Sequence, residues 1–191
     1  SSRYQRSRSY CCTSIYLLFS QQRSFKVIFT SIPFQFNTDY MDIKMKIQND
    51  TGDSSLNIQL NFLDDLDDVY LRYAVALESN EGNYTVLINR TVNFCQFLKQ
   101  RSSESSLKVI YEDVLKQGDF VKICPIKKGQ YYVHEYRVDE EILPSYLPET
   151  NFLVTMQMDR ANWVNLFKGT LHGRIDKSKG FNNLKMFSMG K

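Results

Sequence analysis

The chain has 191 residues and a mass of 22.4 kDa, which is enough for one domain with a full hydrophobic core and short for two. Hydrophobic residues make up 42% of it, with four prolines and eight glycines, so the composition excludes disordered and fibrous proteins. The net charge of +3 comes from the two ends, because residues 27–167 hold 13 basic and 20 acidic residues. A nucleic-acid-binding protein carries its positive charge on the folded face that meets phosphate, so we do not expect one here.

The first 24 residues have the order of a secretory signal. Three arginines precede an apolar run at residues 10–19, and polar residues follow it. Ten apolar residues are too few for a membrane-spanning helix, which takes about twenty. The sequence therefore predicts a signal-peptide remnant at residues 1–24, an extracellular location and no membrane span. The alternative is a core strand behind a basic tail.

Alternation of apolar and polar residues dominates the chain before its third cysteine. It is clearest at residues 56–62, where four apolar side chains alternate with three amides, as in a strand with one buried side. The same pattern predicts strands at residues 25–29, 41–47, 69–77 and 84–88. The acidic stretch 64–68 interrupts the pattern and lacks the glycine and the distant glutamate of a calcium loop, so we expect a solvated turn and no metal ion.

Helical periodicity appears once in the second half. Five apolar residues recur at the spacing of one helix face, namely Leu107, Ile110, Tyr111, Val114 and Leu115. A shorter helical turn is predicted at residues 94–98, and Gly118 is a plausible stop for the longer helix.

Strand alternation returns at residues 132–138, 152–158 and 164–167. Many short strands with a single helical interruption are typical of an antiparallel sandwich. We therefore expect a mainly β, immunoglobulin-like β-sandwich with one or two short helices between Cys95 and Cys124. The predicted domain covers residues 25–172, and residues 173–191 form a basic tail.

Cys95 and Cys124 are the only thiols after the predicted signal, so we expect them to form a disulfide. The bridge closes a loop of about 30 residues, worth roughly 3–4 kcal/mol in the chain-entropy model, and it persists only in an oxidising compartment. Three sequons of the N-x-[ST] type, at Asn49, Asn83 and Asn89, are candidate glycosylation sites that fit the same location.

The order of several motifs carries a family resemblance. These motifs are Asn37, Tyr40, the run Cys95-Gln96-Phe97-Leu98, the pair Cys124-Pro125 and the paired Leu-Pro element at residues 143–148. The chain resembles an insect family of secreted proteins of unknown function that includes the chemosensory B proteins. The chain departs from the family pattern in two places. It lacks the second cysteine pair that relatives commonly carry near the N-terminus, and it has Glu149-Thr150 where a small residue usually follows the second Leu-Pro.

Members of that family are similar to the ML lipid-recognition domains, in which two sheets spread apart to admit a lipid. The resemblance implies a cavity lined by inward-facing apolar residues. The candidates are Ile58, Leu60, Phe62, Tyr73, Val75, Leu77, Val154, Met156 and Met158. The alternative is that these residues fill a close-packed core, in which case the chain is an extracellular module that recognises another protein.

Motifs of catalysis do not occur in the sequence. His134 and His172 are the only imidazoles, and there is no nucleophile elbow, phosphate-binding glycine loop or His-Glu-x-x-His run. We therefore expect a protein that is not an enzyme and uses no cofactor. The resemblance implies that it binds a lipid or hydrocarbon and has a chemosensory role, and an extracellular receptor would be a further partner.

Overall fold

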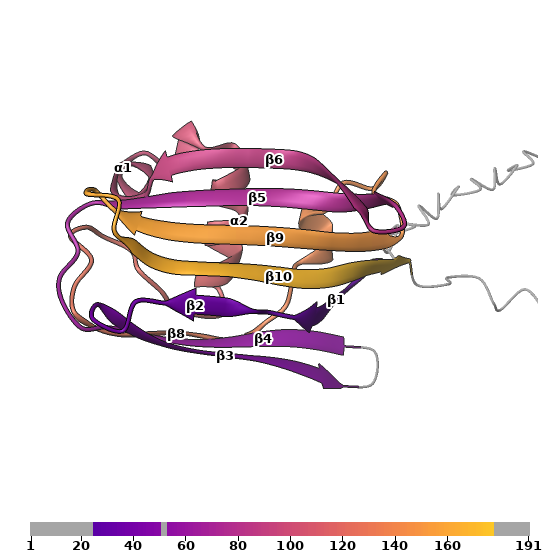
Figure 1. The fold of residues 1–191 in the computed structure, drawn as a ribbon. Helices are drawn as coiled ribbons and strands as arrows, with labels where there is room; N and C mark the ends of the chain where they lie inside the picture. Colours follow the sequence, from indigo (N-terminus) through magenta and orange to yellow (C-terminus); the bar gives the residue numbers. More distant parts are fainter. Residues whose placement is uncertain (1–24, 51–52, 178–191) are drawn as a thin grey trace, which may run out of the picture.

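A computed structural model describes residues 25–50 and 53–177, which form two antiparallel sheets stacked face to face (Figure 1). The larger sheet contains β1 (Phe25–Ser31), β2 (Phe34–Phe36), β5 (Val69–Asn80), β6 (Asn83–Asn93), β9 (Thr150–Arg160) and β10 (Asn165–Lys177). Its strand order is β1-β10-β9-β5-β6, with β2 paired to β10. The smaller sheet has the order β3-β4-β8-β7 and contains β3 (Met41–Asp50), β4 (Asp53–Phe62), β7 (Gly118–Asp119) and β8 (Gly129–Tyr136). The predicted mainly β, antiparallel sandwich is confirmed.

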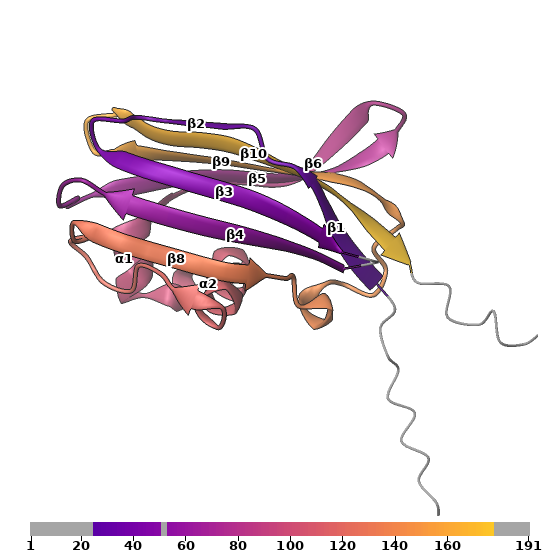
Figure 2. The same cartoon turned by 90° about the horizontal axis from the view of Figure 1, so that it is seen from below.

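Helices join the two sheets along one side. The chain forms α1 (Phe94–Lys99), α2 (Ser105–Leu115) and the 3-10 turns η1 (Arg101–Ser103) and η2 (Glu140–Ile142). Helix α1 packs against β5 and β6 of the larger sheet, whereas α2 packs against β7 and β8 of the smaller one. Figure 2 shows both helices beside β8, and β1 crossing the ends of β3 and β4, which it contacts.

Three strands differ from the sequence prediction. Strands β2 and β7 were not predicted, because three and two residues are too few to show a period of two. Strand β10 is much longer than residues 164–167 and ends at Lys177. The predicted domain boundary at residue 172 therefore falls inside β10, and the first five residues of the predicted tail belong to the sheet. The predicted signal at residues 1–24 lies outside the described residues.

Apolar side chains between the sheets form two core clusters. The first lies at the end of the sandwich that carries α1 and includes Phe62, Leu71 and Phe97. The second lies toward the described termini and includes Phe29 and Phe152. Burial of each such side chain contributes about 1.5–3 kcal/mol.

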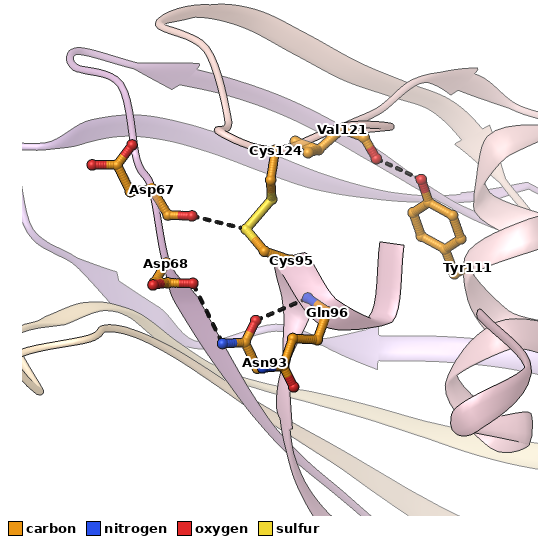
Figure 3. The surroundings of a disulfide bond; sticks show 8 residues. All are labelled: Asp67, Asp68, Asn93, Cys95, Gln96, Tyr111, Val121 and Cys124. Atoms are coloured by element: carbon orange, nitrogen blue, oxygen red, sulfur yellow. Dashed lines mark hydrogen bonds between the residues drawn. A yellow bond between two sulfur atoms is a disulfide. The ribbon is translucent and has the colours of Figure 1, made fainter. Parts of the chain in front are cut away.

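The predicted disulfide between Cys95 and Cys124 is present, with a Cα–Cα distance of 5.6 Å (Figure 3). It joins α1 to the segment that precedes β8. Asn93 caps α1, because its side-chain oxygen accepts a hydrogen bond of 2.9 Å from the backbone N–H of Gln96. Cys95 Sγ also lies 3.0 Å from the carbonyl oxygen of Asp67, so the bridge packs against the turn that leads into β5.

Candidate ligand-binding cavity

A cavity of about 190 Å³ lies inside the first core cluster, between the two sheets and α2, and its lining surface is wholly apolar. Two larger hollows in the described part of the chain are lined mainly by polar and charged side chains. One lies at the hairpins around Glu78 and Glu149, and the other on the outer face of the smaller sheet beside Tyr132 and His134. The apolar cavity is therefore the better candidate for a small-molecule site.

The two sheets and helix α2 line the cavity on three sides. From the smaller sheet, β3 contributes Ile43 and Met45, β4 contributes Ile58, Leu60 and Phe62, and β8 contributes Val133. From the larger sheet, β5, β9 and β10 contribute Val69, Leu71, Met156, Met158 and Phe167. Helix α2 closes the third side with Leu107, Ile110, Tyr111 and Val114. The i, i+3, i+4, i+7 spacing of these four residues turns them all toward the sheets.

Five of the nine residues proposed as cavity candidates line this space. They are Ile58, Leu60 and Phe62 of β4 and Met156 and Met158 of β9. A role of these residues in ligand binding stays a prediction.

The other four candidates lie elsewhere. Tyr73 is buried in the first cluster, with its hydroxyl 2.9 Å from Ser106 Oγ on α2. Leu77 and Val154 pack against the second cluster, farther along β5 and β9. Val75 is half-buried and lies where the register between β5 and β6 shifts.

Met156 shows that the inner face of β9 is not fully covered. It lies two residues from Met158 on the same side of the strand, and both side chains line the cavity. Its side chain is nevertheless 39% exposed. Across the space, the paired residues Met45 and Ile58 are also only half-buried. Inward-facing apolar side chains from both sheets therefore lack complete packing partners at this position.

Tyr111 is the only lining residue with a titratable side chain. Burial raises the pKa of its hydroxyl above the ordinary value, an effect that the nearby Arg101 and Lys122 oppose. The hydroxyl donates a hydrogen bond of 2.6 Å to the carbonyl oxygen of Val121 and so is already satisfied. The wall therefore presents no charge to a ligand at neutral pH.

Sequence reasoning missed the helical wall and the segment after it. The apolar stripe of α2 was recognised as one face of a helix but was not assigned to the cavity. Phe120, Val121 and Ile126 also line it and come from the loop segment that the disulfide fixes to α1. The sequence did contain a signal for the helical wall, because the apolar stripe of an amphipathic helix packs against an apolar surface.

The acidic turn and the histidines lie outside the cavity. Asp65 forms an ion pair of 2.7 Å with Lys127 and accepts a hydrogen bond from the backbone N–H of Lys128, and both contacts lower the pKa of its carboxyl. Leu66, in the middle of the acidic turn, is buried and bridges to Ile126, which anchors the turn to the core. His134 is exposed on the outer face of β8, with its ring 5.1 Å from that of Tyr132.

Residues 69–154 match the profile of the family described as "Protein of unknown function (DUF1091)". The match runs from the start of β5 into β9 and so includes α1, α2 and both bridged cysteines. The expected resemblance to a family of unknown function is confirmed over this shorter range. No curated protein matches the chain.

Two solved structures are similar to the chain at low identity. Chicken MD-1 complexed with lipid IVa is 12% identical, with a TM-score of 0.37, covering 78% of this chain and 97% of that one. A Niemann-Pick type C2 protein from the Japanese carpenter ant is 9% identical, with a TM-score of 0.32, covering 78% and 92%. Among the described residues of our chain, neither α-helix has the length and apolar character needed to cross a membrane.

Proposed function

We propose that this protein is an extracellular, non-enzymatic binding protein that holds a small apolar ligand, a lipid chain or a hydrocarbon, in the cavity between its sheets. The supporting observation is the exposure of inward-facing Met156 beside a space lined only by apolar side chains. In a close-packed core such a side chain is buried and in contact on all sides. A chemosensory use of the ligand belongs to the same proposal.

The size of the cavity limits what can bind. An engineered apolar cavity of about 150 Å³ stays dry and binds benzene, whereas drug-sized ligands occupy roughly 300–1,000 Å³. At about 190 Å³, this cavity suits a single ring or a short stretch of hydrocarbon chain. A longer chain requires α2 and the sheets to move apart, and flexible methionines on both walls ease such repacking.

The disulfide supports the extracellular location. A bridge of this kind is rare in the reducing cytosol and persists in secreted proteins. It also holds the loop that carries Phe120 and Val121, two residues of the cavity wall.

An extracellular protein-recognition module is the second candidate. Tyr146 is 83% exposed and Trp163 is 60% exposed, and aromatic residues are enriched in protein interfaces. This alternative needs no ligand in the core, so a test of cavity binding separates the two functions.

The test uses benzene as the probe and methyl signals of methionine in an NMR titration. We expect saturable shifts of the Met45, Met156 and Met158 signals, because these side chains line the cavity. Met156→Trp should fill the space and abolish the shifts. The matched control is Val109→Trp, which adds the same ring to an exposed position of α2 and should leave binding unchanged. No saturable shift in the parent protein, or equal loss in both variants, contradicts the proposal.

A further inference from the structure

Strand β6 is an exposed edge of the larger sheet. It is the terminal strand in the described sheet order, pairs with β5 on one side and runs for 11 residues (Figure 1). Val86 and Leu87, which are 57% and 56% exposed, are consecutive and so lie on opposite faces. Arg90 is the only charged residue of the strand. A long edge strand with an exposed apolar pair and a single charge is a template for pairing with another strand, and folded proteins normally block it.

Two sequons lie on either side of the exposed apolar pair. Asn83 begins β6 and Asn89 lies two residues beyond Leu87, and both asparagines are exposed. Their threonines, Thr85 and Thr91, are exposed as well. Asn89 pairs in register with the small residue Ala74, so the neighbouring strand leaves space beside it.

Asn49 of the third sequon is exposed as well, but both ends of its side-chain amide are hydrogen-bonded. The side-chain nitrogen of Asn49 donates a hydrogen bond of 3.0 Å to the carbonyl oxygen of Phe29, and its side-chain oxygen accepts one of 2.6 Å from Ser54. Ser54 is buried and in turn accepts a hydrogen bond from the backbone N–H of Phe29. The Asn49 amide therefore holds the end of β3 to β1, and a sugar on that nitrogen would crowd this contact.

We propose that Asn83 and Asn89 carry N-linked glycans, that these glycans cover the β6 edge and prevent its pairing with other chains, and that Asn49 is unmodified in the folded, secreted protein. In each transfer the side-chain nitrogen of asparagine attacks C1 of an oligosaccharide carried on a polyprenyl diphosphate. The new N–C1 bond replaces the C1–O bond to diphosphate, the amide loses one proton, and the polyprenyl diphosphate leaves. The inference rests on the extracellular location proposed above, and it is independent of the ligand.

Site mapping tests the modification. The full chain is produced behind a cleavable secretion signal in cultured eukaryotic cells, so the result does not depend on how the natural chain is targeted. Enzymatic release of the glycans in heavy-oxygen water converts each occupied asparagine to labelled aspartate, which peptide mass spectrometry locates. We expect label at Asn83 and Asn89 and none at Asn49. An unlabelled Asn83 or Asn89, or a labelled Asn49, overturns the assignment.

Sedimentation of the glycosylated protein and of a deglycosylated protein, the Asn83→Gln, Asn89→Gln double variant, tests the protective role. The variant is used because enzymatic release would leave a charged aspartate at each of these two positions of β6. We expect the glycosylated protein to stay monomeric at concentrations about tenfold above those at which the deglycosylated protein associates. Val86→Lys should restore the monomer without glycans, because a charge on an edge strand opposes pairing. Val109→Lys places the same charge on α2 and should not restore it. A deglycosylated protein that stays monomeric, or rescue by both lysines, refutes edge protection.

Discussion

Asp159 is a carboxylate held almost out of contact with water, at 1% exposure, on the outer side of the larger sheet. Arg72 donates to its Oδ2 at 2.7 Å, and the side-chain amides of Gln157 and Asn165 donate at 3.0 and 2.9 Å. The Arg72 guanidinium also lies over the Trp163 ring at 5.5 Å. Three donors on one carboxylate tie β5, β9 and β10 together.

These contacts set the pKa of Asp159. Burial alone would raise the pKa of the carboxyl, but the hydrogen bonds from Gln157, Asn165 and Arg72 outweigh it and leave the pKa lowered. A carboxyl whose pKa is lower in the folded chain stabilises the fold above its unfolded pKa, about 3.9. That stabilisation is lost as the pH falls through the lower, folded value.

Asp159→Asn should lower the free energy of unfolding at pH 7 by about 1.5–3 kcal/mol, because hydrogen bonds to a charged group are lost and the new amide nitrogen cannot accept one. Urea unfolding followed by circular dichroism measures the change. The difference between the parent and the variant should shrink as the pH is lowered from 5 to 2. Asp42→Asn, at an exposed position of β3, is the control and should change little. A difference that is independent of pH would show that the charge of Asp159 is not responsible.

At the scale of elements, the disulfide and the two helices set the shape of the cavity. Cys95→Ala combined with Cys124→Ala should lower the free energy of unfolding by about 3–4 kcal/mol, because an open loop of 30 residues gains conformational entropy in the unfolded chain. Urea unfolding of this variant and of the reduced parent protein measures the loss, and the two should agree. A loss well below 1 kcal/mol in both would mean that packing of α1 alone fixes this segment.

Helix α2 allows a second test within one element. Leu107 is buried and lines the cavity, whereas Val109 on the same helix is 44% exposed. Leu107→Ala should cost about 2–5 kcal/mol of stability, the range for a large-to-small change in a core. Val109→Ala should cost almost nothing, and thermal unfolding of the two variants provides the comparison. Similar losses in both would indicate that helix propensity, not burial, controls the stability of α2.

Strand alternation predicted the two faces of β5 and β9 but not the position of the cavity along them. Twelve residues of β5 extend over about 40 Å at roughly 3.3 Å per residue. Tyr73 and Leu77 therefore lie about 13 Å apart along the same strand, and they pack in different clusters. A period of two tells which face a residue occupies, whereas the place of a void depends on where a distant helix packs. The same limit explains why the contact of Asp159 with Arg72, 87 residues away, has no local signal.

For the whole molecule, a ligand that binds only the folded chain must raise its stability. At a benzene concentration of about 100 times its dissociation constant, the free energy of unfolding should rise by about 2.7 kcal/mol. Differential scanning calorimetry would record this rise as a higher Tm for the parent protein and for Val109→Trp. Met156→Trp should show no dependence of Tm on benzene. A Tm that falls with benzene in all three proteins would indicate denaturation by the solvent instead of binding.

The two core clusters give the sandwich unequal ends. The second cluster, around Phe29 and Phe152, lies where β1 pairs with the last six residues of β10 and Phe25 is opposite Lys177. The cavity lies mainly in the first cluster and reaches the junction between the two, where Met45 and Phe120 contact both. If the cavity takes up a molecule as proposed, we expect the side chains around Met45 and Phe120 to shift, while the pairing of β1 with β10 stays intact.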